Sequence, residues 1–596
     1  MRRLELLVCV AATLGWGCRG TVVDHVPLDI ALPGAPECHA SIGPITLTAL
    51  GDFPTSDRVV AQIDGRGAPI DPITRFPSSV LAFAVSAHAP SAGWDAFGWA
   101  MRASVTDDPA LVMRPLGLSC PLADPEARLP IGAGIAVLDE ARVMFVGGLD
   151  ERGEAMRRVA ILHVREERVE LPRVDHVIPI AFAAATLVPE GDAVLVAGGA
   201  ARQGGDPAQT WERIPLNGGA ATFGSLVVPR RDHGAIAVDV GRVHGVLLVG
   251  GSDGSRALRS IEWVDPTSDG GDVMRASLAF PRVSPLLVQL DASHIAVVGG
   301  LDEPGGRPVA SIEVLDVAHD SIRTLSVALG APDWIAALPS GRVAWATTTT
   351  LSIVSPREER IDTAAVAPSV LDPVAVGLGS GRVLLEGHRA DGGRLGYLID
   401  PGAGTVTALA TSRVPRDMVA LFDGATLELA ATGASVRRDE RLTPFDSPPP
   451  SYLFAADRAA LALDASARWT TSGGVLEVHA GFDDARLDVP VLRLRDFEAL
   501  LDGVGSYDVV LTGEHLETLA TISVTDAAVS LGACTVSRAA DARVRIARTS
   551  EGSLVIGSEA GATVACHALD HALRVGIGIV AHQGASLRSL ALTRDL

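Results

Sequence analysis

The sequence of 596 residues contains no lysine, and Asn217 is its only asparagine. Without lysine the chain cannot form the phosphate-binding loop that ends in Gly-Lys followed by Ser or Thr, so that nucleotide site is excluded. Its 50 basic and 71 acidic side chains give a formal charge of -21. A nucleic-acid binder needs a basic contact surface, and we therefore expect no nucleic-acid partner.

Cysteine is also scarce, with six residues and no Cys-x-x-Cys spacing, which removes the basis for a zinc ribbon or a thioredoxin-like site. Two of the six lie in the first 18 residues. The other four form two local pairs, Cys38 with Cys120 and Cys534 with Cys566. Disulfides are common in exported proteins, so we expect one bond within each pair.

The first 17 residues have the features of an export signal. Arg2 and Arg3 precede an apolar stretch from Leu4 to Leu14, which is too short for a stable membrane span, and small residues follow. The segment resembles a bacterial lipoprotein signal, in which the first cysteine after cleavage, here Cys18, receives the lipid. This resemblance implies an exported protein of the cell envelope, anchored to the outer membrane by the lipid alone. The alternative is ordinary secretion after cleavage behind Gly17. Residues 18–40 are expected to be a linker.

An apolar run that ends in two glycines recurs along the middle of the chain. Four clear copies, spaced by 51, 52 and 49 residues, occupy 143–148, 194–199, 246–251 and 295–300. Weaker copies begin near residues 343, 383 and 426. Each clear copy has further strand-like segments before and after it, as in the Ser-Ile-Glu segments at Ser260 and Ser311. Four short strands in every fifty residues, repeated about seven times, predict a β-propeller, with seven blades favoured and six as the alternative.

The double glycine after the second strand resembles the kelch-repeat family over residues 127–442. The resemblance implies an all-β, kelch-type β-propeller. Most of the Tyr and Trp that kelch blades carry at set positions are missing here.

A Pro-Arg pair precedes several of the expected blades. If these segments lie on one face of the propeller, the arginines could line a mouth that binds carboxylate or sulfate groups, because guanidinium grips such oxyanions bidentately. The competing interpretation is that each arginine pairs with a nearby Asp and locks neighbouring blades together. The arginines concerned are Arg173, Arg230, Arg282 and Arg416.

Two further domains are expected to flank the propeller. Residues 41–126 alternate in strand fashion and predict a small β-sandwich, in which Trp94 and Trp99 lie in a Gly-containing loop, either in the core or exposed for sugar stacking. Residues 443–450 are a proline-rich linker. Residues 451–596 contain about ten strand-like runs and resemble a laminin-G or concanavalin-like jelly roll, a fold that binds carbohydrates and proteins.

No residues stand out as a catalytic, metal or cofactor site. Gly250-Gly251-Ser252-Asp253-Gly254 matches a hydrolase nucleophile pattern, but a strand follows it where that motif requires a helix. We therefore expect a non-enzymatic binding or scaffold protein that recognises an unidentified protein or glycan through propeller loops and the C-terminal domain. The alternative is a carbohydrate-active lyase or hydrolase with its site in the propeller channel.

Overall fold

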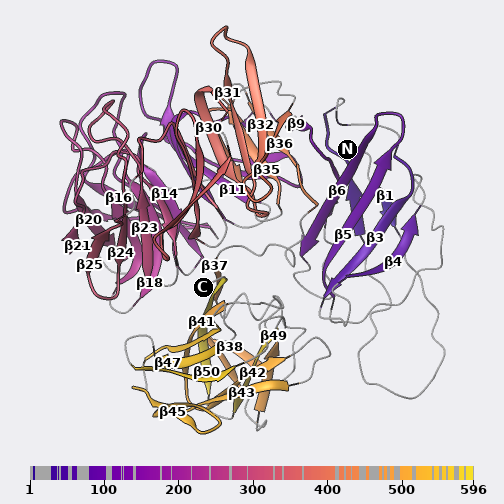
Figure 1. Cartoon of the computed structure of the whole chain (residues 1–596), viewed down its shortest axis with the longest axis vertical. Helices are drawn as coiled ribbons and strands as arrows, with labels where there is room; N and C mark the ends of the chain where they lie inside the picture. The colour runs from indigo at the N-terminus through magenta and orange to yellow at the C-terminus, as the bar shows by residue number, and fades with distance from the viewer. Residues whose placement is uncertain are drawn as a thin grey trace. The chain divides into compact units, whose positions relative to one another are not determined.

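The structure is a computed structural model of the whole chain (Figure 1). It describes Leu4–Leu6 and most of the chain from Leu28 onward. Shorter gaps of one to five residues aside, the undescribed stretches after Leu6 are 7–27, 64–79, 102–109, 442–450, 456–468, 489–496 and 569–575. The elements of the described part are β-strands, with no α-helix among them. Within this part no helix is long and apolar enough to cross a membrane.

Seven four-stranded antiparallel sheets make up the middle of the chain, and each is one propeller blade. This confirms the predicted propeller and its favoured number of blades. In blade order the strands are β10 (Ile131–Val137), β11 (Arg142–Leu149), β12 (Val159–His163) and β13 (Arg168–Glu170); β14 (Ala184–Leu187), β15 (Ala193–Ala197), β16 (Thr210–Pro215) and β17 (Thr222–Ser225); β18 (Gly234–Val240), β19 (Val243–Val249), β20 (Ser260–Val264) and β21 (Gly271–Ser277); β22 (Leu286–Gln289), β23 (His294–Val298), β24 (Ile312–Asp316) and β25 (Ser321–Thr324); β26 (Trp334–Ala337), β27 (Val343–Ala346), β28 (Leu351–Ser355) and β29 (Arg360–Ala365); β30 (Leu371–Gly377), β31 (Val383–His388), β32 (Arg394–Asp400) and β33 (Thr405–Leu409); β34 (Asp417–Ala420), β35 (Thr426–Ala430), β36 (Gly433–Arg437) and β9 (Ser119–Pro121).

The second strand of a blade is mainly apolar because both of its faces are buried. In β11, Val143 and Phe145 pack toward blade 7, whereas Met144 and Val146 pack toward blade 2. Equivalent hydrophobic clusters lie between each later pair of blades, and the cluster between blades 7 and 1 completes the circle. A continuous apolar run in a four-residue to eight-residue strand is the pattern expected of a strand covered on both sides.

The last blade takes its outermost strand from the other end of the propeller sequence. Its strand order is β34-β35-β36-β9, so a segment that precedes blade 1 completes blade 7. Beyond β9, the Leu122 amide donates to the Ala434 carbonyl at 2.9 Å. The compact propeller unit spans Pro121–Val436, a few residues before the expected 127–442 at each end.

Before the propeller lies a domain of two sheets. The larger sheet has the order β4-β3-β5-β6-β8, and the smaller is β1-β2-β7. Strand β2 corrects the expectation that all of 18–40 is linker, because it pairs in parallel with β7. Trp94 and Trp99 lie on β6 rather than in a loop, and Trp99 is buried. The strands are β1 (Leu4–Leu6), β2 (Leu28–Ala31), β3 (Ile45–Gly51), β4 (Asp57–Ile63), β5 (Val80–Ala89), β6 (Trp94–Met101), β7 (Ala110–Val112) and β8 (Arg114–Pro115).

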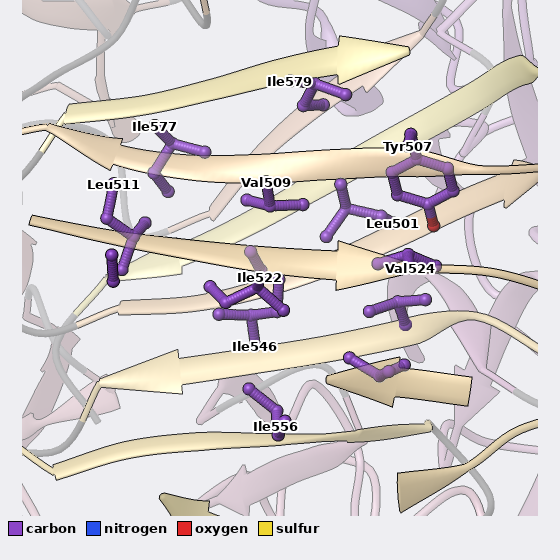
Figure 2. Packing of buried hydrophobic residues seen from close by; sticks show 14 of the residues in the cluster. Leu501, Tyr507, Val509, Leu511, Ile522, Val524, Ile546, Ile556, Ile577 and Ile579 are labelled. Atoms are coloured by element: carbon purple, nitrogen blue, oxygen red, sulfur yellow. The ribbon is translucent and has the colours of Figure 1, made fainter. Parts of the chain in front are cut away.

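The C-terminal domain is a sandwich of two antiparallel sheets. One has the order β38-β39-β50-β41-β46-β47-β48, with β37 also on β50, and the other is β40-β49-β42-β43-β44-β45. Figure 2 shows Tyr507, Val509 and Leu511 of one sheet with Ile546 and Ile556 of the other in a shared core. The strands are β37 (Ser451–Ala455), β38 (Trp469–Ser472), β39 (Val475–Val478), β40 (Asp484–Asp488), β41 (Phe497–Val504), β42 (Tyr507–Thr512), β43 (Thr518–Val524), β44 (Ala528–Leu531), β45 (Cys534–Ser537), β46 (Val544–Arg548), β47 (Ser553–Ser558), β48 (Thr563–Ala568), β49 (Gly576–His582) and β50 (Ser586–Arg594).

The structure contains one of the two expected disulfides. Cys38 and Cys120 are bonded and buried, and Cys120 belongs to β9. Cys534 and Cys566 are free thiols, which corrects the expectation of a bond between them in this state. The lipidation candidate Cys18 and the proline-rich linker 443–450 lie outside the described residues.

Candidate binding face of the propeller

All blades present the same four strand ends on one side of the ring. In a four-stranded antiparallel sheet with consecutive strands, the first strand begins where the second ends, the third begins and the fourth ends. This side carries the double glycines and the connections between blades. We call it the double-glycine face.

The first three double glycines join their blades to the segments that lead into the next blades. The Gly148 amide donates to the Ile180 carbonyl, the Gly199 amide to Arg230, and Gly251 to Arg282, each at 2.8 Å. Both residues of each double glycine have positive φ, a conformation that glycine adopts without steric cost. The repeated Gly-Gly is therefore required by the packing of neighbouring blades.

Two of the four predicted arginines are buried and cannot contact a ligand, which corrects the expected arginine-lined mouth. Arg230 donates to Glu262 at 2.9 Å, and Arg282 donates to Glu313 at 2.8 Å, with both ion pairs fully buried. Both glutamates come from the repeated Ser-Ile-Glu segments. The arginines thus lock the repeat together, as the competing interpretation held, but their partner is a Glu of the third strand rather than a nearby Asp.

Each glutamate also secures the connection that precedes its blade. Glu262 accepts the backbone N–H groups of Val227 and Val228, and Glu313 accepts those of Ala279 and Phe280. Desolvation alone would make these buried charges unfavourable, and the paired guanidinium with the two amides offsets that cost.

Arg416 does not share this position. Arg416 is exposed, and its amide donates to Leu429 within blade 7. Arg173 lies outside the described residues. The backbone position equivalent to Arg230 in blade 2 is Ile180, as their matching bonds to the double glycines indicate. The Pro-Arg dipeptide was therefore not a reliable marker of one structural position.

A series of left-handed residues links the starts of the innermost strands of blades 2, 3 and 4. Phe182, Asp232 and Ser284 have φ of 58°, 51° and 51°. The Phe182 amide donates to the Gly132 carbonyl, the Asp232 amide to the Phe182 carbonyl, and the Ser284 amide to the Asp232 carbonyl. Each residue is therefore hydrogen-bonded to its counterpart in the preceding blade. Such conformations are uncommon outside glycine and persist where surrounding structure holds them. The sequence carries no recognisable signal for this series of left-handed residues.

Carboxylates occupy the same region of the double-glycine face. Burial raises the pKa of Asp232, and the neighbouring Arg231 acts in the opposite direction. The Asp417 side chain reaches solvent but has protein atoms on most sides, and the resulting desolvation raises the pKa of its carboxyl group. The hydrogen bond that the Met418 amide donates to this carboxyl group lowers the pKa. Asp372, also at φ 49°, is exposed at the corresponding position of blade 6. The raised pKa values of Asp232 and Asp417 make this region a candidate functional site.

His233 follows Asp232 and is buried between blades 2 and 3. Its side chain lies against Gly198 and Gly251, and neither ring nitrogen has a hydrogen-bond partner. Burial, and secondly the charge of Arg230, lower the pKa of His233 to about 3. The imidazole is therefore neutral at physiological pH.

Exposed apolar side chains concentrate on the double-glycine face. The described residues include seven exposed large hydrophobic side chains, and five of them lie at the start of an innermost strand or on the connection leading to one. These five are Ile131, Leu171, Val227, Phe280 and Leu371. The other two, Phe223 and Val406, lie on the outermost strands β17 and β33.

The described residues provide no sign of a reaction centre. Ser252 of the nucleophile-like pattern is buried, and its Oγ accepts the Gly254 amide in a local turn. Among these residues no group of three His, Cys, Asp or Glu side chains could hold a metal ion. The tryptophans Trp211, Trp334 and Trp345 are buried in the blades and offer no exposed ring for stacking.

No family model and no curated protein matches the chain. Among solved structures, it is similar to that of YjhT, with a TM-score of 0.35 and 11% identity over 49% of this chain and 99% of that one. It is also similar to the WD40 β-propeller domain of Doa1, with a TM-score of 0.34 and 10% identity over 54% of this chain and 95% of that one. The propeller assignment therefore rests on the sheet order and the circle of inter-blade cores.

Proposed function

We propose that this chain is an exported binding protein whose double-glycine face recognises an apolar and cationic segment of a partner protein. The observation that carries the proposal is the concentration of exposed Ile, Leu, Val and Phe side chains on that face. Contiguous exposed apolar residues on a soluble domain are typical of interaction sites. A rigid ring of blades is suited to hold such residues in fixed positions.

A protein partner fits this face better than a glycan. Sugar recognition commonly relies on exposed aromatic rings that stack on the pyranose, whereas Trp211, Trp334 and Trp345 are buried and Trp263 is partly buried. The exposed side chains are mainly aliphatic, which suits apolar side chains of a partner. Asp232, Asp372 and Asp417 add carboxylates beside them, and these would attract Arg or Lys of the bound segment.

The test is selection of peptides on the full chain. A random peptide library would be panned on immobilised protein, and the affinities of the recovered peptides measured in solution. We expect peptides with apolar and basic residues. Their affinity should fall at least tenfold in the triple variant Leu171→Ser, Val227→Ser and Phe280→Ser, because apolar contacts dominate such interfaces.

The matched control removes exposed apolar side chains from outside the face. The variant Phe223→Ser with Val406→Ser should bind the selected peptides like the wild type. Equal loss in both variants, or no loss in the triple variant, would contradict the assignment of the face. Saturable binding to a glycan array with no selected peptide would favour a carbohydrate ligand instead.

Export is supported by the N-terminal sequence and is compatible with the Cys38–Cys120 disulfide. We propose that Cys18 is the lipidated residue and that the lipid is the only membrane contact. Expression in a bacterial host followed by mass measurement should find a diacylglyceryl mass that Cys18→Ser removes. If the wild-type protein were secreted without a lipid, the proposed membrane anchor would be wrong, and the proposed role of the double-glycine face would not be affected.

A further inference from the structure

The two free thiols lie at one edge of the C-terminal sandwich. Cys534 begins β45, the last strand of the six-stranded sheet, and Cys566 lies on β48, the last strand of the other sheet. Strands β45 and β48 contact each other, and both cysteines pack beside the core shown in Figure 2. The pair therefore faces across the gap between the two sheets.

A β-bulge places Cys566 in this position. On β47, Leu554 pairs with His567 and Val555 pairs with Ala565, so Cys566 is the extra residue of β48 and has no cross-strand partner. A bulge in an edge strand changes the direction of a side chain relative to the regular pleat. Here the Cys566 Sγ donates to the Val564 carbonyl at 3.6 Å, and the thiol interacts electrostatically with Cys534.

On the facing sheet, a tight turn positions Cys534. Leu531 pairs with Cys534 across the hairpin between β44 and β45, and Gly532 in the turn has a φ of 58°. Both thiols are half-buried, in contrast to Cys38 and Cys120, which are buried. A small disulfide reagent can therefore reach the C-terminal pair without unfolding of the domain.

We propose that Cys534 and Cys566 form a reversible dithiol–disulfide site, which joins the two sheets of the C-terminal sandwich when a small-molecule disulfide is present. Cys38–Cys120 is the permanent bond of the chain and Cys534–Cys566 is the switchable one. Closure adds a covalent link at this edge of the sandwich, where β45 and β48 contact each other but belong to different sheets. The proposal is independent of the propeller's binding face.

The chemistry is thiol–disulfide exchange. The Cys534 thiolate attacks one sulfur of the oxidant RSSR and expels RS⁻, which takes up the proton that Cys534 released. Cys566 then loses its proton, attacks the Cys534 sulfur of the mixed disulfide and expels the second RS⁻, giving two RSH and the protein disulfide. Burial, and secondly the neighbouring Cys534, raise the pKa of the Cys566 thiol to about 12. The second step is consequently slow at neutral pH and faster at alkaline pH.

The test uses the full folded chain in glutathione buffers of graded oxidised fraction. Free thiols are alkylated, and peptide mass mapping assigns each cysteine separately, so Cys9 and Cys18 do not interfere. We expect a Cys534–Cys566 cross-link that forms with oxidised glutathione and opens with reduced glutathione, while Cys38–Cys120 stays bonded throughout. Amide exchange in β45 and β48 should slow at least tenfold in the cross-linked form, and cross-linking should be faster at pH 9 than at pH 7.

The variant Cys566→Ser tests whether glutathione can reach Cys534, separately from whether the two thiols are placed to form a bond. It should leave Cys534 trapped as a mixed disulfide with glutathione, which establishes that the reagent reaches the site. Absence of the cross-link in wild type under every buffer overturns the proposal. A cross-link that opens only when the chain is unfolded also overturns it, because that bond would be structural.

Discussion

At the scale of single residues, Glu262 and Glu313 each connect the third strand of a blade to the segment that leads into that blade. Each glutamate lies on the third strand of its blade. It binds an arginine of the connection that leads into that blade, and it accepts hydrogen bonds from two backbone amides of the same connection. A fully buried ion pair contributes little net stability against an apolar substitute, but loss of one partner leaves the other charge buried alone. These side chains therefore fix how consecutive blades meet.

Replacing one glutamate should be costly. We expect Glu313→Ala to lower the free energy of unfolding of the propeller by about 3–5 kcal/mol, because Arg282 and two amides lose their acceptor inside the protein. Urea unfolding followed by amide exchange in β22–β25 measures this. Glu358→Ala removes the exposed partner of Arg360 and should cost less than about 1 kcal/mol. Similar costs in the two variants would contradict the role of the buried pair.

His233 should make the propeller sensitive to acid. Its pKa is about 3 in the folded chain and near the ordinary 6.5 in the unfolded chain, so the unfolded state binds more protons between these values. The contribution of the neutral imidazole is complete above pH 6.5 and is lost as the pH falls toward 3. From pH 7 to pH 5 this amounts to about 2 kcal/mol. We expect His233→Gln to unfold with a correspondingly weaker pH dependence, measured by urea midpoints at both values. An unchanged dependence would refute the assignment.

At the scale of structural elements, the end of the second strand is the most constrained turn of the blade. A Cβ added at Gly147 would lie 2.0 Å from the Ile180 carbonyl oxygen of the next blade, and φ there is 67°. Gly153, in the loop that follows, has a φ of 79° but nothing within 4 Å of the same position. The two glycines share a backbone conformation and differ in their surroundings.

Alanine variants of these two glycines distinguish the cost of a positive φ from the cost of a steric clash with the next blade. Gly153→Ala should cost about 1 kcal/mol, the usual penalty for alanine at positive φ. Gly147→Ala should cost several times more, because the carbonyl it meets is itself bonded to Gly148 and cannot move freely. Thermal unfolding of both variants provides the comparison. If both glycines tolerate alanine equally, the double glycine is not needed for the contact between blades.

The same element explains what the sequence could predict. The first four blades can be recognised in the sequence because their buried second strands are apolar and end in or are followed by Gly-Gly. In blade 5 the equivalent strand ends at Ala346 and is followed by Thr347-Thr348 in place of two glycines, so its pattern is weak although the fold is kept. The arginines were recognised, but not their partners, because Arg282 and Glu313 are 31 residues apart and meet only in the packed blade.

At the scale of the whole molecule, the propeller is closed by a strand from outside its repeats. Sequence periodicity could not place β9, since its three residues resemble no blade strand and precede the first repeat. The series of left-handed residues at the start of the innermost strands could not be predicted from the sequence either, because it depends on hydrogen bonds between successive blades. Closure by an early segment means that the last blade is complete only when both ends of the unit are present.

The Cys38–Cys120 bond should therefore stabilise the closure of the ring. It joins residues separated by 82 positions and holds one end of β9 in place. Loss of such a cross-link increases the freedom of the unfolded chain by an amount worth roughly 4 kcal/mol. We expect Cys38→Ser with Cys120→Ser to lower the unfolding midpoint, and amide exchange in β36 to accelerate more than in β23, which lies in a blade remote from the closure. Uniform acceleration in both strands would mean that the bond stabilises the chain without any specific role at β9.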